Sequence, residues 1–170
     1  MVSLEIIALV LTGLGLTASI VYYASVLRNA NKTQQMQLET RQSQFLMQVY
    51  NQFDTREKQE SFFELWKWEW NNFDEFWEKY GPDTNPEQWS KLLRLLMFYE
   101  GLGTLVKTKK LPIHDIYLLM GGLTILIWEK FIPILGLMRE NASYPRLASE
   151  TEYLYYELVK HREQHPELAT

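Results

Sequence analysis

A stretch of 22 residues near the start of the chain, Ile6 to Leu27, contains no charged side chain. As a helix that rises about 1.5 Å per residue it reaches roughly 33 Å, which is enough to cross a hydrocarbon core of about 30 Å. Glu5 is the only charged residue before it, and Arg28 and Lys32 follow it. The stretch therefore predicts a transmembrane helix close to the N-terminus.

Two other kinds of segment have a similar composition. A secretory signal peptide has a basic start and an apolar region of about 7–15 residues. Here no Lys or Arg precedes the run, the run is longer, and only Thr17-Ala18-Ser19 and Ala24-Ser25 resemble cleavage sites. A buried helix of a soluble protein is the other alternative, but this uncharged run is long for one. We therefore favour a retained span.

The charges that flank the span predict its orientation. Arg28, Lys32 and Arg41 follow the span, and no Lys or Arg precedes it. The positive-inside rule then places the N-terminus outside and residues 28–170 in the cytoplasm, as in a single-pass protein of the cell membrane. The chain contains no cysteine, which agrees with a reducing compartment.

The composition of the remaining chain limits its partners. Aromatic residues make up 14% of the sequence, so bulky side chains are expected to dominate one core. The net charge of −4 disfavours nucleic acid as a partner. Residues 54–87 carry ten acids and four bases, whereas residues 88–146 carry eight bases and four acids. We expect these halves to pair within one monomer, and pairing between subunits is the alternative.

The sequence predicts helices throughout and no strand, so the expected fold class is all-α. No Gly or Pro occurs between Leu27 and Gly81, so the membrane helix can continue through a Gln-rich stalk into the domain. A flexible polar linker over residues 29–44 is the alternative. The expected organisation is a transmembrane anchor (1–27), a polar helical stalk (28–44), a helical bundle domain (45–165) and a tail (166–170).

One long helix is predicted to start with Asp54 as its N-cap and to end at Gly81-Pro82. It holds four tryptophans within twelve residues, at positions 66, 68, 70 and 77. Helical spacing places most of the aromatic residues on one face, with Trp68 off that face. We interpret them as a core face with one tryptophan near a surface. A cofactor-binding or sugar-binding stack is the alternative.

Four shorter helices are expected after this one. Asn85-Pro86 starts the first, which ends in lysines at positions 107, 109 and 110. A short helix from Pro112 is expected to stop at Gly121-Gly122, and the next to bend or break at Pro133. Ser149-Glu150-Thr151-Glu152 has the pattern of a capping box for the last helix.

The segment from Ile116 to Met138 is a second candidate span. It is apolar except for Thr124, Glu129 and Lys130. Two central charges cost several kcal/mol in lipid unless they are paired. We therefore expect buried helices of the domain core here.

Few residues are candidates for a chemical role. His161 and His165 are four apart on the last helix, and Glu157 precedes His161 by four, a spacing that suits metal ligands. Two histidines without a third clustered ligand make this a weak metal candidate, and a solvated helix end is preferred. No catalytic or cofactor-binding residue and no cofactor is predicted.

Three charged residues in apolar surroundings, Glu100, Glu129 and Lys130, are expected to be buried. We expect the carboxylates to pair with bases such as Arg94, Lys107 or Lys130. A general base at Glu100 is the alternative.

Small residues within the span predict self-association. Gly13 and Thr17 are four apart, as are Gly15 and Ser19. Small residues at this spacing let two membrane helices approach closely. The alternative is that small residues are common in any membrane helix.

The most specific sequence pieces are WEKYGP at residues 77–82, EGLG at residues 100–103 and WEKF at residues 128–131. With these pieces, nearly the whole chain resembles an uncharacterised family of small single-pass membrane proteins, a domain of unknown function from archaea and bacteria. The resemblance implies a membrane-anchored helical domain and assigns no catalytic residues.

We therefore expect a membrane-anchored helical interaction or assembly module, either self-associating or an accessory subunit of a membrane complex. Its expected partners are the lipid bilayer and a second copy or another membrane protein. A small oligomeric channel or pore is one alternative. A membrane-tethered enzyme of unknown class is another.

Overall fold

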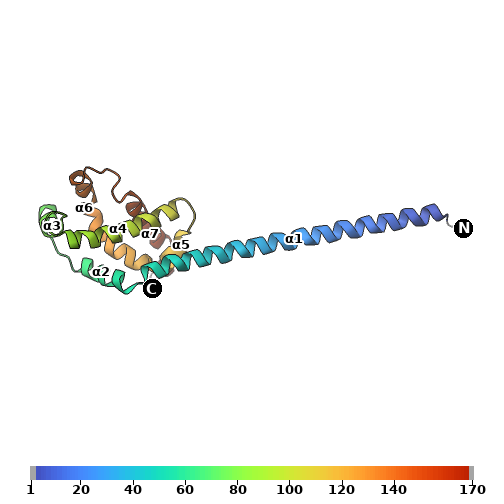
Figure 1. Cartoon of the computed structure of the whole chain (residues 1–170), viewed down its shortest axis with the longest axis horizontal. Coiled ribbons are helices and arrows are strands. Elements are labelled where there is room, and N and C mark those ends of the chain that lie inside the picture. Colours follow the sequence, from blue (N-terminus) through green and yellow to red (C-terminus); the bar gives the residue numbers. More distant parts are fainter. Residues whose placement is uncertain (1–2, 169–170) are drawn as a thin grey trace. The chain divides into compact units, whose positions relative to one another are not determined.

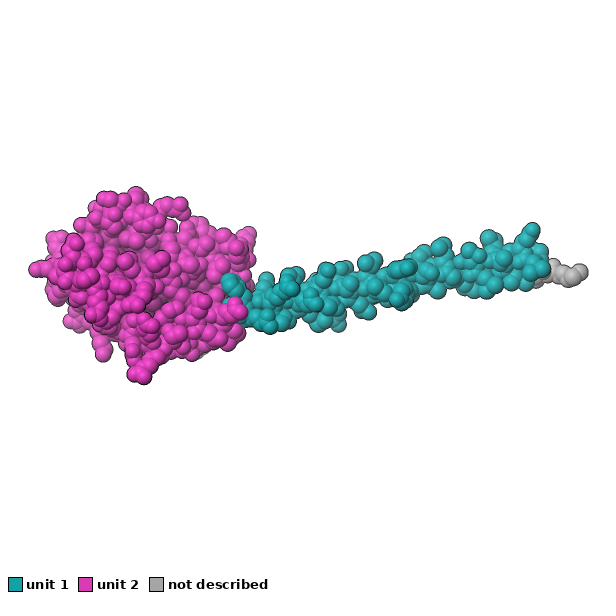
Figure 2. All heavy atoms as spheres, viewed as in Figure 1, with its two compact units in different colours: residues 1–45 teal, residues 46–170 magenta. Residues whose placement is uncertain are grey.

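A computed structural model describes residues 3–168 of the chain, and those residues form helices and no strand. The elements are, in chain order, α1 (Leu4–Phe53), α2 (Arg56–Trp66), α3 (Phe73–Tyr80), α4 (Pro86–Lys107), α5 (Ile113–Ile116), the π-helix η1 (Tyr117–Gly121), α6 (Gly122–Asn141), α7 (Ser149–Gln164) and the 3-10 helix η2 (Pro166–Leu168) (Figure 1). The all-α prediction is confirmed. The chain divides into two compact units, residues 1–45 and residues 46–170 (Figure 2).

The first unit is one uninterrupted helical stretch of α1. The Gln-rich residues 29–44 are helical, so the alternative of a flexible linker there is wrong. The Ser and Thr hydroxyls of the apolar run all donate to the carbonyl four residues earlier: Thr12 to Ala8, Thr17 to Gly13, Ser19 to Gly15 and Ser25 to Val21, at 2.8–2.9 Å. The Ser and Thr hydroxyls of the apolar run are therefore all satisfied within the helix, which suits a helix in lipid.

The second unit begins within the last two turns of α1. Val49 and Phe53 are buried there, and the Phe53 ring packs 5.6 Å from Phe98 and 6.2 Å from Tyr99 between centroids. Tyr99, on α4, is fully buried and contacts Trp128 of α6 at 5.4 Å. Aromatic rings thus connect α1, α4 and α6 in the core. Most of the other buried apolar side chains are leucine and isoleucine, so aromatic residues do not dominate the core as the composition predicted.

The tryptophan-rich segment forms two helices instead of the predicted one. α2 ends at Trp66, and α3 begins at Phe73 with Asn72 as its N-cap, whose side chain accepts from the Glu75 amide at 2.9 Å. Asn side chains stabilise helix starts better than helix interiors, so this pair of helices replaces a continuous one. The N-cap position of α2 is Thr55 and not Asp54, so that prediction is wrong.

The break between α2 and α3 reverses the expected positions of two tryptophans. Trp68 is buried and stacks on Tyr80 at 4.0 Å between ring centroids, whereas Trp66 is 40% exposed. The prediction that Trp68 lies off the core face assumed a helix through residues 67–72. An irregular backbone there turns the Trp68 ring inward.

The predicted end of α3 and start of α4 are confirmed, whereas the predicted end of α4 is confirmed at Lys107 alone, because Lys109 and Lys110 follow the helix. α3 ends at Tyr80, and Gly81 follows as its C-cap. α4 starts at Pro86, and the Asn85 side chain accepts from the Gln88 amide at 3.4 Å. α4 ends at Lys107, where a cation complements the helix dipole.

Gly121-Gly122 does not stop a helix as predicted. α5, η1 and α6 form one continuous helical segment over Ile113–Asn141, with a π-turn at residues 117–121. Both glycines have helical backbone angles, with φ of −59° at each, so the helix continues through them. Pro133 lies inside α6 without ending it.

α4 and α7 pack in close contact in the second unit. A Cβ atom at Gly103 would lie 2.0 Å from the Glu150 carbonyl oxygen, so only glycine fits this approach. The predicted capping box of α7 is wrong, because its N-cap position is Ala148, with φ of 57°, and no side chain of the box caps the helix. Instead, the Glu100 carboxylate of α4 accepts hydrogen bonds from backbone amides in the first turn of α7.

Candidate functional site

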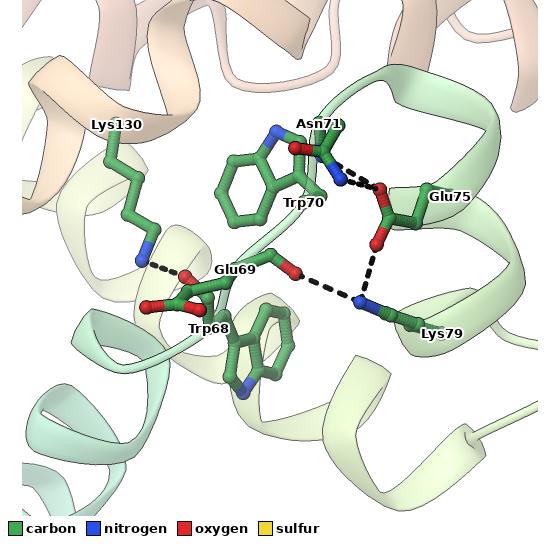
Figure 3. Close-up of a pocket in the computed structure, with 7 residues that line it drawn as sticks. All are labelled: Trp68, Glu69, Trp70, Asn71, Glu75, Lys79 and Lys130. Carbon is green, nitrogen blue, oxygen red and sulfur yellow. Dashed lines mark hydrogen bonds and ion pairs between the residues drawn. The ribbon is translucent and has the colours of Figure 1, made fainter.

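A pocket of about 590 Å³ lies beside the segment that joins α2 to α3 (Figure 3). It is lined by two tryptophans, four charged residues and an amide: Trp68, Glu69, Trp70, Asn71, Glu75, Lys79 and Lys130. These residues come from the irregular segment at 67–72, from α3 and from α6, so the pocket is assembled by the break in the predicted helix.

Lys130 reaches from α6 to the end of α2. Its Nζ donates to the Trp66 carbonyl at 2.6 Å and to the Trp68 carbonyl, and it lies 5.1 Å from the centroid of the Trp70 ring. Burial lowers the pKa of Lys130 below its ordinary value, an effect that Glu69 opposes. The ammonium therefore satisfies carbonyls at the C-terminal end of α2, where the helix dipole is negative.

Glu75 and Lys79 form the opposite wall of the pocket. Glu75 accepts from Lys79 Nζ at 2.5 Å and from the backbone and side-chain nitrogens of Asn71 at 2.8 Å. Hydrogen bonds from Lys79 and then from Asn71 lower the pKa of Glu75 to about 2. Lys79 also donates to the Glu69 carbonyl at 3.4 Å (Figure 3). This wall is thus held in one geometry by hydrogen bonds.

The arrangement suits binding of a polar group. Glu69 is exposed and its carboxylate makes no hydrogen bond among the described residues, while Lys79 and Lys130 are engaged with carbonyls. Two carboxylates and two ammonium groups balance one another, and the ring of Trp70 supplies an apolar wall. A ligand with hydrogen-bond donors could bind Glu69 and contact the ring.

Sequence reasoning missed this pocket. Lys130 is separated from Trp68 by more than 60 residues, and helical periodicity does not indicate that they meet. Two local signals were present. The tryptophan cluster, for which a binding stack was the alternative interpretation, supplies Trp68 and Trp70 to the pocket. Asn71-Asn72 are residues that favour helix starts and turns over helix interiors.

Glu100 accepts hydrogen bonds from the start of α7. Its Oε2 atom accepts from the amides of Glu150 at 3.0 Å and Thr151 at 2.9 Å, and from the Thr151 hydroxyl at 3.0 Å. The predicted pairing with a base is wrong, because no Lys or Arg among residues 3–168 forms an ion pair with Glu100. The carboxylate instead caps α7 from another helix, where the dipole favours negative charge. Its neighbour Glu150 pairs with Lys107 at 2.9 Å.

The other two predicted buried charges also have different surroundings from those expected. Glu129 is exposed, and its side chain, 47% accessible, lies 3.6 Å from Arg162, so the prediction of a buried carboxylate there is wrong. Lys130 is half-buried and binds carbonyls, not the carboxylate partner expected of it. Both charges lie at the edge of the covered side of α6, where long side chains reach partners.

The predicted metal candidates are only partly brought together. His161 contacts His165, with ring centroids 4.4 Å apart, and its hydrogen-bond partner is His114 of α5. Glu157 takes no part in these contacts. Within residues 3–168 no group of three or more His, Asp or Glu side chains is arranged to hold a metal ion.

The small residues of the span are accessible. A Cβ atom at Gly13 or Gly15 would meet nothing within 4 Å, and the Thr17 and Ser19 hydroxyls cover the carbonyls of these glycines. Self-association of the chain through these small residues stays a prediction.

The family of the chain follows from comparison with family models. Residues 6–158 match the family described as a domain of unknown function, DUF4760, and the chain belongs to that family. The expectation of an uncharacterised family is confirmed. No curated protein and no solved structure matches the chain.

Proposed function

We propose that this protein is a single-pass, membrane-anchored helical module that assembles with copies of itself or with another membrane protein. In this proposal α1 anchors the chain through residues 6–27, the N-terminus lies outside, and the helical domain lies in the cytoplasm. The domain then serves as the part that contacts other proteins.

The observation that carries the proposal is the exposure of the apolar part of α1. Two helices among the described residues, Leu4–Phe53 and Ile113–Asn141, are long and apolar enough to cross a membrane. None of the most apolar window of the first is buried within the protein. This much apolar surface needs lipid or another apolar partner, since its transfer into water is unfavourable.

The ends of the apolar run support the proposed orientation. Tyr22 and Tyr23 lie near its C-terminal end, where aromatic residues favour a membrane interface, and Arg28 and Lys32 follow. No basic residue precedes the run. This asymmetry favours the cytoplasm for the C-terminal side.

Assembly is proposed through the small residues of α1, which form the two pairs Gly13–Thr17 and Gly15–Ser19. Residues two apart point to opposite sides of a helix, so each pair lies on its own face. Gly13 and Gly15 leave open space on the helix, so a second helix can approach its backbone closely at either face. The four Ser and Thr hydroxyls of the span are satisfied within the helix, so packing contacts rather than hydrogen bonds from these groups would hold the pair.

The domain offers surfaces of its own for a partner. The pocket at Trp70 and Glu69 presents an aromatic wall and an exposed carboxylate. Large apolar side chains on the uncovered side of η1 and α6 are also exposed, namely Leu118, Leu123, Leu126 and Leu137. Both features support contact with another protein.

The mass of the detergent-solubilised protein, measured by light scattering, tests the assembly. We expect a particle larger than one chain, and a smaller particle for Gly13→Leu with Gly15→Leu, because two large side chains prevent close approach of the helices. The control, Ile20→Leu with Val21→Leu, alters the span without filling the glycine positions and should keep the wild-type mass. A monomeric wild type, or an unchanged mass in the glycine variant, would refute association through Gly13 and Gly15.

A further inference from the structure

All three histidines of the chain meet at one place in the domain. His114 lies on α5, His161 near the end of α7, and His165 directly after α7. His114 Nδ1 and His161 Nε2 are 3.3 Å apart, and the ring centroids of the three side chains are 4.4 to 6.3 Å from one another. His161 is buried, with 7% of its surface exposed.

The contact between His114 and His161 requires a neutral ring. One ring nitrogen must donate its N–H and the other must accept, and a doubly protonated imidazole has no acceptor nitrogen. Protonation of both rings therefore removes the hydrogen bond and places two positive charges side by side. The contact is therefore sensitive to acid.

Other titratable groups face the cluster from the elements around it. From η1, the Tyr117 ring lies 5.1 Å from the His161 ring. From η2, the Glu167 carboxylate lies 3.0 Å from His165 Nδ1. The His165 ring in turn lies against the buried His161 ring, with centroids 4.4 Å apart.

We propose that the cluster of His114, His161 and His165 is a pH-responsive contact that holds α5 and η1 against the end of α7 at neutral pH and releases them in acid. α5 and η1 both pack on α7. The effect reaches η1 through Tyr117, whose ring fills the space that a Cβ at Gly121 would need, 2.8 Å away. Release of the cluster therefore loosens the π-turn.

The direction of the pH effect follows from the surroundings of His161. Burial, and then the nearby His165 and His114, lower the pKa of His161 below its ordinary value, and Glu167 opposes this. Between the pKa of folded His161 and about pH 6.5, the unfolded chain then binds more protons than the folded protein. The free energy of unfolding is therefore highest above about pH 6.5, falls as the pH drops from there, and levels off below the pKa of folded His161.

Hydrogen exchange of the full-length protein in detergent tests the proposal. Amide protection in residues 113–121 and 158–165, corrected for the intrinsic exchange rate, should fall between pH 7.5 and pH 5.5. The expected fall is about tenfold for each unit by which the pKa of His161 is lowered. Residues 73–80 contain no histidine and provide the internal control, with unchanged protection.

Two variants separate the cluster from other acid effects. His114→Gln keeps a polar side chain at an exposed position but does not titrate, so it should reduce the acid response and leave the larger part that comes from the burial of His161. His161→Gln should abolish the whole acid response. If His161→Gln fails to fold, the double variant His114→Gln with His165→Gln replaces it and should weaken the response further than His114→Gln alone. Equal wild-type protection at both pH values, or a full acid response in the histidine variants, would overturn the proposal.

Discussion

Two helical segments within residues 3–168 are apolar enough to cross a membrane, and they differ in how much of their apolar surface is buried within the protein. In Leu4–Phe53 none of the most apolar window is buried within the protein, whereas in Ile113–Asn141 half of it is. The covered side of the second segment carries Trp128, Phe131 and Leu135, each at most 1% exposed. Composition and length thus identify candidate spans, and side-chain packing distinguishes between them.

The central charges of the second segment explain the difference. Lys130 donates to two carbonyls at the end of α2, and Glu129 lies near Arg162 of α7. Each charged side chain thus interacts with a polar group on another segment of the domain. In lipid the same pair would need its partners inside the membrane. The first segment carries no charge that requires such a partner.

An arginine placed in each of the two apolar segments should have the largest effect on membrane retention, and the effect should differ between the segments. Leu14→Arg places a charge near the centre of the proposed span and costs about 2.5–3.5 kcal/mol in insertion. Leu126→Arg changes an exposed position on α6. We expect carbonate extraction to release much of the first variant and none of the second. Equal loss of both from the membrane fraction would show that Ile113–Asn141 also spans the bilayer.

Truncations on the two sides of α6 measure how much of it is core. Phe131→Ala removes a ring that is 1% exposed and should lower the free energy of unfolding by about 3–5 kcal/mol. Leu126→Ala, at a side chain that is 40% exposed, should cost less than about 1 kcal/mol. Urea unfolding in detergent, followed by tryptophan fluorescence, gives both values. A similar cost at Leu126 would mean that a partner covers this face.

A pair of glycines tests the contact of α4 with α7. Gly103→Ala places a methyl group against the Glu150 carbonyl and should destabilise the domain by about 1–3 kcal/mol. Gly101→Ala, where a Cβ meets nothing within 4 Å, should instead stabilise it by up to about 1 kcal/mol through helix propensity. The same urea experiment compares them. Changes of the same sign would contradict the packing described.

Removal of the cap on α7 should have the smallest effect. Glu100→Ala leaves two amides at the start of α7 without their acceptor, at a cost of about 0.5–2 kcal/mol. Glu60→Ala, which removes an exposed pair with Arg56, is the control and should change stability by less than about 0.5 kcal/mol. A loss above 3 kcal/mol at Glu100 would indicate a buried ion pair after all.

Features encoded by neighbouring residues were predictable from the sequence. The uncharged run of Ile6–Leu27, the start of α4 at Asn85-Pro86 and the end of α3 at Gly81 each depend on side chains within a few positions of one another. Helical periodicity also gave the all-α class, because it reflects one repeating local geometry.

Features that join distant segments were decided by the tertiary structure. Glu100 caps a helix that begins about 50 residues later, Lys130 binds carbonyls more than 60 residues earlier, and His114 meets His161 across 47 positions. Local patterns predicted a capping box at Ser149 and a helix end at Gly121-Gly122. Neither forms in the folded protein. The physical reason is that a carboxylate, an ammonium or an imidazole forms hydrogen bonds with whichever donor or acceptor the fold places beside it. The sequence by itself determined the all-α class and which run is apolar enough to enter a membrane. The packing of those helices against one another decided what their polar side chains bind.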